Sequence, residues 1–281
     1  MRAELNLFQT HKFPRTRYQG SKYKLQAWIK NNLEKLDFET ALDAFSGTSS
    51  IAYIMKEMDK TVYCNDILAF NYHIAQALIE NNSQQITKDE FEDIIKKKEG
   101  YQYASFIQDT FEDIYFLDEE NRWLDIVIQN INKLQNKNNK AYNKDIFTLD
   151  ISVDLVYFDT PYIPQKGTLT HYRDFYHFLD GLIDYENWHK QIDYTSKHKK
   201  LKSTYNIFED KKNILNGFEK LIKKFKESII VISYRSDGMP TIEEISKILK
   251  KYKKSVEIES IDYQYVLSKK QELKEVLIIG K

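Results

Sequence analysis

The sequence contains few of the features that mark secreted, metal-clustered or membrane-spanning proteins. Its single cysteine, Cys64, excludes an internal disulfide and any cage built from several cysteines. No apolar run reaches the roughly 18 residues of a transmembrane helix. The first 25 residues are polar and basic, without the apolar centre of a signal peptide. We therefore expect a soluble cytoplasmic protein, with one sizeable core and room for a small second lobe.

Net charge is also absent, because 42 Lys and Arg residues balance 42 Asp and Glu residues. The charges are unevenly placed along the chain. Residues 1–35 and 190–226 carry balances of +6 and +7, whereas residues 84–125 carry −7. A neutral chain with two basic segments can still bind a polyanion such as nucleic acid. Solvated helix faces give the same pattern, so the charges alone leave both interpretations open.

The sequence does contain an alternation of short apolar strands and amphipathic helices. This alternation is typical of α/β architecture with a parallel sheet, and the last two strand-like runs predict a closing antiparallel hairpin. The expected strands are 40–45, 61–66, 153–158, 228–234, 255–266 and 274–281, and the expected helices include 23–36, 51–58 and 68–81.

Residues 84–140 interrupt the alternation. They are rich in acids, amides and lysines, and they predict helices joined by polar connections. We expect residues 1–83 and 141–281 to form one α/β domain, and residues 84–140 to form an inserted, mainly helical lobe.

A strand-to-helix turn at 42–50, LDAFSGTSS, is a candidate ligand loop. Open α/β sheets bind ligands at the carboxyl ends of their strands, and Gly47 permits a tight turn close to a ligand. The pattern of a dinucleotide or phosphate loop is missing. Asp66, at the end of the next strand, can accept hydrogen bonds from both hydroxyls of a ribose. An ordinary turn at Gly47 and a helix N-cap at Asp66 are the alternatives.

The most specific stretch is an apolar strand that runs into Asp159, Thr160, Pro161 and Tyr162. Pro161 fixes its own backbone and keeps Thr160 extended, which predicts a rigid corner. The exocyclic amine of a base is a poor nucleophile, because its lone pair is delocalised into the ring. A carboxylate and a backbone carbonyl that accept from this amine would localise the lone pair, and Tyr162 would stack on an extruded base.

Four motifs in order carry a resemblance to a known family: RYQGSK (17–22), DAFSGT (43–48), ND (65–66) and DTPY (159–162). Together they resemble the Dam-like DNA adenine methyltransferases, which include many restriction–modification enzymes. The resemblance implies a Rossmann-like methyltransferase sheet with a reversed hairpin at one edge. It also implies S-adenosyl-L-methionine as cofactor, double-stranded DNA as partner, and methylation of the N6 amine of a flipped adenine.

The resemblance further implies roles for individual residues. Tyr18 and Lys22 would contact the cofactor, Phe45 and Gly47 would form the wall and floor under its methionine part, and Asp145 or Ile146 would flank its adenine. The catalytic set would be Asp159, Thr160, Pro161 and Tyr162. The cofactor set would be Tyr18, Lys22, Asp43, Phe45, Ser46, Gly47, Thr48, Asp66, Ile67, Asp145, Ile146 and Asp159.

One position departs from the family pattern, because Thr160 stands where the commonest form of the tetrapeptide has a first proline. Thr160 retains an N–H and more backbone freedom. We expect activity to survive, since Asp159, Pro161 and Tyr162 carry the proposed chemistry. The departure leaves open an inactive relative that keeps only the fold.

Target recognition is expected in two places, the 84–140 lobe and the basic stretch after the tetrapeptide. Lysines of the run 195–212 would track phosphates, while Arg122 and the residues around His171, in the stretch 165–191, would approach bases. No metal site is expected, because the spacing of His171, His177 and His189 fits no common zinc pattern. The candidate DNA-binding residues are Arg122, His171, Tyr172, Arg173, Lys197, Lys199, Lys200 and Lys202.

Other functions stay open at this point. Methylation of RNA or of a cytosine amine is one, although cytosine-directed enzymes more often begin the tetrapeptide with Ser, so Asp159 favours adenine. A small-molecule or glutamine methyltransferase is another. For the favoured function we expect a monomer or weak dimer, and a cognate restriction endonuclease encoded separately.

Overall fold

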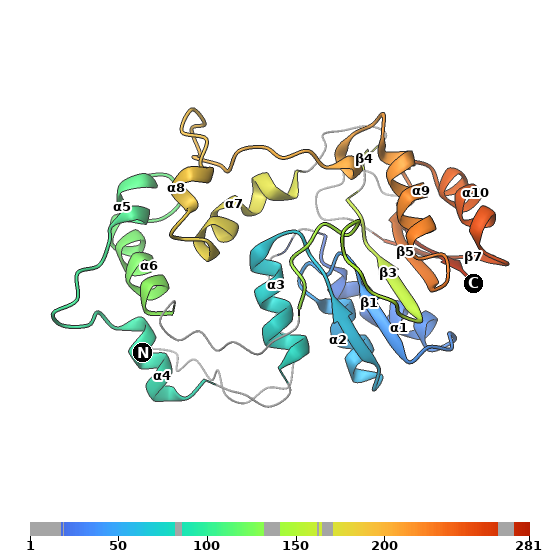
Figure 1. Cartoon of the computed structure of the whole chain (residues 1–281), viewed down its shortest axis with the longest axis horizontal. Coiled ribbons are helices and arrows are strands. Elements are labelled where there is room, and N and C mark those ends of the chain that lie inside the picture. The colour runs from blue at the N-terminus through green and yellow to red at the C-terminus, as the bar shows by residue number, and fades with distance from the viewer. Residues whose placement is uncertain are drawn as a thin grey trace.

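Six strands form one sheet, which lies in the right-hand part of the molecule as Figure 1 shows it. The structure is a computed structural model that describes residues 18, 20–81, 86–131, 141–161, 163–164, 171–263 and 273–281. The strands are β1 (Thr40–Asp43), β2 (Thr61–Cys64), β3 (Leu155–Phe158), β5 (Ile229–Arg235), β7 (Val256–Asp262) and β8 (Lys274–Gly280). Their order in the sheet is β2-β1-β3-β5-β8-β7.

The first four strands in that order are parallel, whereas β8 is antiparallel to both β5 and β7. The chain leaves β1 for β2 on one side and later returns to β3 on the other side. This reversal creates a crevice at the carboxyl ends of β1 and β3, where open α/β sheets bind ligands. The Rossmann-like sheet with its terminal antiparallel hairpin, predicted from the sequence, is therefore confirmed.

Helices cover both faces of the sheet, so its strands are apolar on both sides. Side chains alternate between the faces: Leu42 and Val156 point to one face, and Ala41 and Leu155 point to the other. The first face packs on α9 (Ile214–Lys224) and α10 (Ile242–Tyr252), and the second packs on α1 (Gln26–Leu33) and α2 (Ser50–Glu57). The short helix η1 (Lys22–Leu25) leads into α1, and α3 (Ala69–Ala75) continues as the π-helical turn η2 (Gln76–Glu80).

A helical lobe stands beside the sheet, and α7 spans the distance between them (Figure 1). The lobe has a hydrophobic core separate from that of the sheet, which contains Ile107, Phe111, Ile128 and Trp188. Gly181 makes room for this core, because a Cβ there would lie 2.0 Å from Nε1 of Trp188. The lobe contains α4 (Lys88–Ile95), α5 (Phe106–Thr110), α6 (Asp118–Ile131), α7 (Tyr172–Ile183) and α8 (Trp188–Gln191).

The predicted helical character of the insertion is confirmed by α4, α5 and α6. The core of the lobe also includes Trp188, Ile192 and Leu201, which lie far downstream of the insertion in the sequence. A second chain segment, from α7 to Leu201, therefore completes the lobe. The proposed boundaries at 83 and 141 stay predictions.

The chain that follows the Asp-Thr-Pro-Tyr corner is held by a small second sheet. In it, β4 (Ile163–Pro164) pairs antiparallel with β6 (Gly238–Met239). A Cβ at Gly238 would lie 2.5 Å from Cε1 of Tyr234, so only glycine lets β6 approach β5 this closely. The corner is thus fixed at both ends, by β3 before it and by β4 after it.

Candidate active site

A cavity of about 1440 Å³ opens at the carboxyl ends of β1, β2 and β3. Its wall includes the Gly47 loop after β1, Asp66 after β2 and Asp159 after β3. The turn η3 (Ile207–Glu209) and the first turn of α7 close the far side. The crevice predicted from the strand order is therefore a real cavity, and residues from distant parts of the sequence meet in it.

Asp66 ties the ends of β1 and β2 together. One carboxylate oxygen accepts from the N–H of Gly47 at 2.8 Å, and the other accepts from the N–H of Leu68 at 2.9 Å. Gly47 has φ +48°, in the left-handed region that favours glycine. The helix N-cap considered from the sequence is not found at Asp66, because α3 (Ala69–Ala75) has Leu68 as its N-cap residue. The first bond holds the Gly47 loop to the end of β2. Burial raises the pKa of Asp66.

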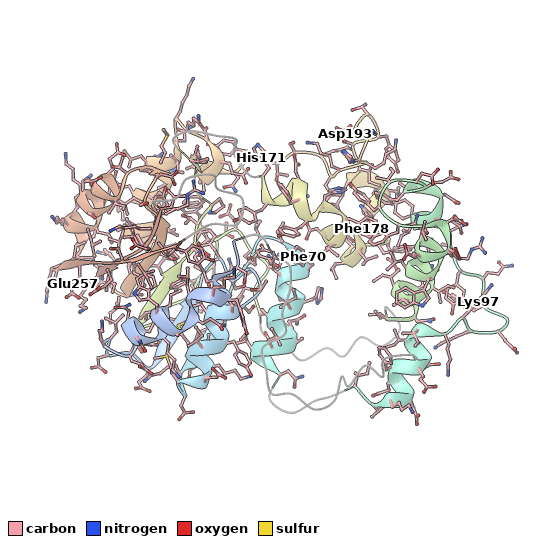
Figure 2. The ribbon with its side chains drawn as sticks, turned by 180° about the vertical axis from the view of Figure 1, so that it is seen from behind. Phe70, Lys97, His171, Phe178, Asp193 and Glu257 are labelled. Carbon is pink, nitrogen blue, oxygen red and sulfur yellow. The ribbon has the colours of Figure 1, made fainter. Side chains whose placement is uncertain are left out.

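Tyr18 packs over the Gly47 loop. Its ring stacks on Tyr176 of α7 with centroids 4.6 Å apart and an angle of 1° between the planes. Its hydroxyl accepts from Nδ2 of Asn71 at 3.1 Å. Figure 2 shows Phe70 at the end of α3 that faces α7, and the Phe70 ring lies 5.3 Å from Tyr176. Tyr18 lines the cavity, and the rings of Phe70 and Tyr176 pack against it from α3 and α7.

Asp159 is paired with Lys22. The Nζ atom of Lys22 donates to both carboxylate oxygens at 2.7 Å, and the side chain of Asp159 remains 22% exposed toward the cavity. Burial raises the pKa of Asp159 to about 6, although Lys22 opposes the rise. The carboxylate is thus placed in the cavity as an anion whose charge is balanced by one ammonium.

Asp43, the last residue of β1, is a second buried acid of the cavity. Its Oδ2 atom accepts from the N–H of Ala52 at 3.2 Å, and its Oδ1 atom has no hydrogen-bond partner among the described residues. Burial raises the pKa of Asp43 to about 8, and the charge of Asp159 adds to the rise. A buried acid with an unpaired oxygen suits a ligand that can donate a hydrogen bond to it.

The structure brings most of the predicted site residues to this one cavity. Thr160 is buried beside it and does not line it, and Tyr162 lies outside the described residues. The predicted residues that line the cavity are Tyr18, Lys22, Asp43, Phe45, Ser46, Gly47, Thr48, Asp66, Ile67, Asp145, Ile146, Asp159 and Pro161.

The candidate DNA-binding residues fall into two groups. His171, Tyr172, Arg173 and Lys200 line the mouth of the cavity. The others lie on the lobe away from the cavity: the Arg122 Nε atom donates to Gln108 at 3.2 Å, and the Lys202 Nζ atom donates to the carbonyl of Lys190 at 2.9 Å. Of the remaining two, Lys197 is exposed, whereas Lys199 is half-buried and lies over the Tyr194 ring.

The sequence indicated the run 195–212 as a segment that tracks phosphates, but not that its residues 203–211 connect the lobe to α9 and line the cavity. Thr204 accepts from Nη1 of Arg173 at 2.9 Å, and Glu209 lies 2.8 Å from Nδ1 of His171. Just before the segment, Lys200 pairs with Asp174 at 2.7 Å. These three contacts bind the crossing chain to the first turn of α7. The only signal in the sequence was the mixture of lysines with Tyr205.

Two asparagines near the cofactor loop were also missed. The Nδ2 atom of Asn65 donates to the carbonyls of Ala44 and Lys144 at 3.3 and 3.1 Å. The Nδ2 atom of Asn143 donates to the carbonyl of Asp66 at 2.9 Å. They join the 141–146 segment to the ends of β1 and β2, which explains why Asp145 reaches the cavity.

Neither a metal centre nor a membrane span is found in the part of the chain that the structure describes. No three His, Cys, Asp or Glu side chains of these residues are grouped to hold a metal ion. No helix among them has both the length and the apolar surface needed to cross a membrane.

Comparison with known proteins identifies the class of this site. Residues 18–132 match the model of the D12 class N6 adenine-specific DNA methyltransferases. The chain is 26% identical to the type II methyltransferase M2.HphI of Haemophilus parahaemolyticus, over 92% of this chain and 94% of that one. It is also 26% identical to the modification methylase StsI of Streptococcus sanguinis, over 90% of this chain and 49% of that one.

Among solved structures, a magnesium protoporphyrin IX methyltransferase from Synechocystis with bound S-adenosylmethionine aligns with a TM-score of 0.41 and 10% identity. The alignment covers 92% of this chain and 76% of that one.

The site is therefore that of a methyltransferase that uses S-adenosyl-L-methionine. Over residues 18–132 the chain is similar to the D12 class of N6 adenine-specific DNA methyltransferases, and DNA is its substrate. The resemblance predicted from the four motifs is confirmed, and the alternatives of RNA, a cytosine amine or a small molecule are disfavoured.

The cavity fits the methyl donor by its own chemistry. The cofactor carries a sulfonium cation and a ribose, and the carboxyl groups of Asp43, Asp66 and Asp159 lie at the strand ends that line the cavity. The Oδ1 atom of Asp43, which has no hydrogen-bond partner among the described residues, can accept from such a ligand. The Tyr18 ring beside Gly47 offers it an aromatic surface.

Proposed function

We propose that this cavity holds the methyl donor beside the target adenine, and that the carboxylate of Asp159 accepts from the N6 amine. The observation that carries the proposal is the position of Asp159, which lines the same cavity as Gly47 and Asp66. These residues come from the ends of three neighbouring strands. A methyl group and an amine bound there are brought within reach of each other.

Different residues of the cavity are proposed to bind the cofactor and the target amine. Asp66 offers carboxylate oxygens to the ribose hydroxyls, while Tyr18 and Phe45 provide aromatic walls. The bound cofactor supplies an electrophilic methyl group. Asp159 draws the N6 amine out of conjugation by accepting its N–H, which localises the lone pair. The amine gains positive charge during transfer and then loses a proton, and the acidic cavity stabilises that charge.

Base flipping follows as part of the proposal, because the amine of a stacked base cannot reach a buried carboxylate. The cavity volume of about 1440 Å³ exceeds the roughly 300–1,000 Å³ of common ligand pockets, so a second nucleoside-sized group has room. Tyr162 is proposed to stack on the flipped adenine, a role that rests on the sequence pattern alone.

We propose that the helical lobe and segment 203–211 contact double-stranded DNA. Segment 203–211 crosses from the lobe to the cavity mouth, where Arg173 and Lys200 lie. The acidic balance of residues 84–125 indicates that the lobe contributes a few specific contacts and little general phosphate attraction. The roles of Arg122, Lys197, Lys199 and Lys202 stay predictions.

The biological setting is proposed from the relatives, which are named as modification enzymes. We propose that this protein protects cytoplasmic DNA at a specific sequence in a restriction–modification system. A cognate endonuclease encoded separately and a monomeric or weakly dimeric state remain part of the proposal.

Single-molecule sequencing of DNA from cells that express the chain tests this function directly. We expect N6-methyladenine at one short sequence motif, at nearly every copy. Cells that express the Asp159→Ala variant are the control and should show no such motif. Unmodified adenine in both samples, or methylation in the variant sample, would contradict the proposal.

A further inference from the structure

A buried carboxylate that belongs to none of the sequence motifs approaches the catalytic pair. Glu275 lies near the start of β8 and is 1% exposed. Its Oε1 atom lies 3.8 Å from Nζ of Lys22, the ammonium that also donates to both oxygens of Asp159. One ammonium therefore faces two carboxylates, of which Asp159 is the nearer.

Glu275 is itself fixed in place. The hydroxyl of Ser233 on β5 donates to its Oε1 atom at 2.5 Å. Other titratable groups near this cluster include Tyr157 of β3, which is fully buried, Asp43 of β1, whose pKa is affected by Asp159, and Arg235 of β5, which is opposite Glu275 in the β5–β8 register. A carboxylate buried this deeply is costly unless a cation lies near it, and the Lys22 ammonium lies 3.8 Å away.

The catalytic role proposed for Asp159 creates a conflict that this arrangement resolves. Both oxygens of Asp159 accept from Lys22, and this close pairing with an ammonium makes each oxygen a weaker acceptor for the N6 amine. Releasing Lys22 without another partner would leave an ammonium unpaired in a buried site. A movement of Nζ by about 1 Å toward Glu275 reaches the distance of a charged hydrogen bond and frees an oxygen of Asp159.

We propose that Glu275 is a positioning residue that takes up the Lys22 ammonium when Asp159 turns to the target amine. This inference rests on the proposed function of Asp159. Lys22 then stays paired throughout the reaction, first mainly with Asp159 and afterwards with both acids. Ser233 holds Glu275 at the correct distance for this exchange.

The Glu275→Gln variant tests the inference, because glutamine keeps the size and still accepts from Ser233 but carries no charge. Transfer of labelled methyl groups to genomic DNA that lacks adenine methylation measures kcat. We expect kcat to fall by at least about tenfold, since the amine then competes with Lys22 for Asp159. Binding of S-adenosylhomocysteine, measured by calorimetry, should change by less than about twofold, because the charge change lies outside the predicted cofactor contacts.

The pH profile separates this role from a merely structural one. The negative charge of Glu275 raises the pKa of Asp159, so its removal should move the acid limb of the kcat profile to lower pH. The matched control is Glu257→Gln on β7, an exposed acid paired with Lys281 at the far edge of the sheet (Figure 2). That variant should match the wild type in kcat and in its pH profile.

Wild-type kcat and an unmoved acid limb in Glu275→Gln would overturn the inference. So would a loss of S-adenosylhomocysteine binding in proportion to kcat, which indicates a general structural defect. If Glu275→Gln does not fold, the Glu275→Asp variant is used instead, because it keeps the negative charge but holds it one methylene further from Lys22. A lower kcat with unchanged S-adenosylhomocysteine binding then supports the inference. A wild-type kcat overturns it. An Asp159→Asn variant that retains activity would instead overturn the proposed function itself.

Discussion

Lys22 donates to both carboxylate oxygens of Asp159 at 2.7 Å, although the two residues lie 137 positions apart in the sequence. The N-terminal motif is thereby joined to the catalytic corner. Both residues line the cavity that also contains Gly47 and Asp66. The charge of Lys22 therefore sets the protonation of the carboxylate that is proposed to bind the amine.

A Lys22→Met variant should show this coupling in its pH dependence. The ammonium lowers the pKa of Asp159, which burial raises to about 6. Its removal should move the acid limb of the kcat profile to higher pH, because Asp159 accepts from the amine only when ionised. Lys24→Met, at an exposed position two residues further on, should leave the profile unchanged. An acid limb at the wild-type pH in Lys22→Met would show that the pair does not control the reaction.

Asp43 should make stability depend on pH. Its folded-state pKa of about 8 lies above the ordinary value of 3.8, so the folded state binds its proton more tightly. This contribution to stability is complete below pH 3.8 and is lost as the pH rises through about 8.

An Asp43→Asn variant removes that loss, because the amide is never charged. Above pH 8 we expect its melting temperature to exceed that of the wild type by at least about 2 °C, the effect of roughly 1 kcal/mol in a chain of this size. Thermal unfolding followed by circular dichroism from pH 5 to 9 measures the difference between the two proteins. A difference that is constant over this range would show that Asp43 does not titrate there.

Gly47→Ala should weaken cofactor binding. The backbone at Gly47 has φ +48°, and a Cβ there would lie 3.3 Å from Cε1 of Tyr18. The new methyl group presses on the aromatic wall of the cavity, so we expect the dissociation constant for S-adenosylhomocysteine to rise by about tenfold, equal to 1.4 kcal/mol. Gly100→Ala is the matched control, with φ +73° and nothing within 4 Å of its Cβ. Equal affinities of the two variants would contradict a cofactor role for this loop.

Thr160→Val should retain activity. The Thr160 side chain is buried, and its hydroxyl has no hydrogen-bond partner among the described residues. Valine has the same shape and removes a buried polar atom that costs about 1–3 kcal/mol when unsatisfied. The melting temperature should stay the same or rise, and kcat should remain within about twofold of the wild type, since no charge near Asp159 changes. A large loss of kcat at unchanged stability would assign the hydroxyl a direct role.

Lys197 and Lys202, in the segment that follows α8 of the lobe, offer a test of DNA contact. Replacing Lys197 and Lys202 by Ala should reduce the dependence of DNA affinity on salt concentration. Each lost phosphate contact lowers the slope of log K against log[salt] by about 0.9. The control pair, Lys247→Ala with Lys250→Ala, lies on the exposed face of α10 beyond the site. Equal slopes for both double variants would exclude this segment from the DNA interface.

Much of this architecture could be predicted from local patterns. Apolar runs located the strands, and Gly47, Asp66 and Asp159 each follow a strand, so the common edge of a parallel sheet brings them together. The order of four motifs gave the class of enzyme. These signals survive in one sequence because each depends on a few neighbouring residues.

The parts that could not be predicted depend on pairings between distant segments. Nothing near Glu275 indicates that β8 carries it to Lys22, because the contact joins two segments about 250 residues apart and depends on the pairing of β8 with β5. Trp188 reads as an ordinary apolar residue, yet it completes the lobe against Gly181. Segment 203–211 has no periodic pattern, and its place at the cavity follows from contacts such as Glu209 with His171.

The most direct test of the central claim is methyl transfer by the Asp159→Asn variant, with tritiated S-adenosylmethionine and unmethylated genomic DNA. Asparagine keeps the size of the side chain and presents an amide in place of the carboxylate. We expect transfer to fall by at least about a hundredfold while S-adenosylhomocysteine still binds, because the neutral amide loses the negative charge that stabilises the amine as it becomes positive. Transfer at the wild-type rate, with the label on the N6 amine of adenine, would contradict the account.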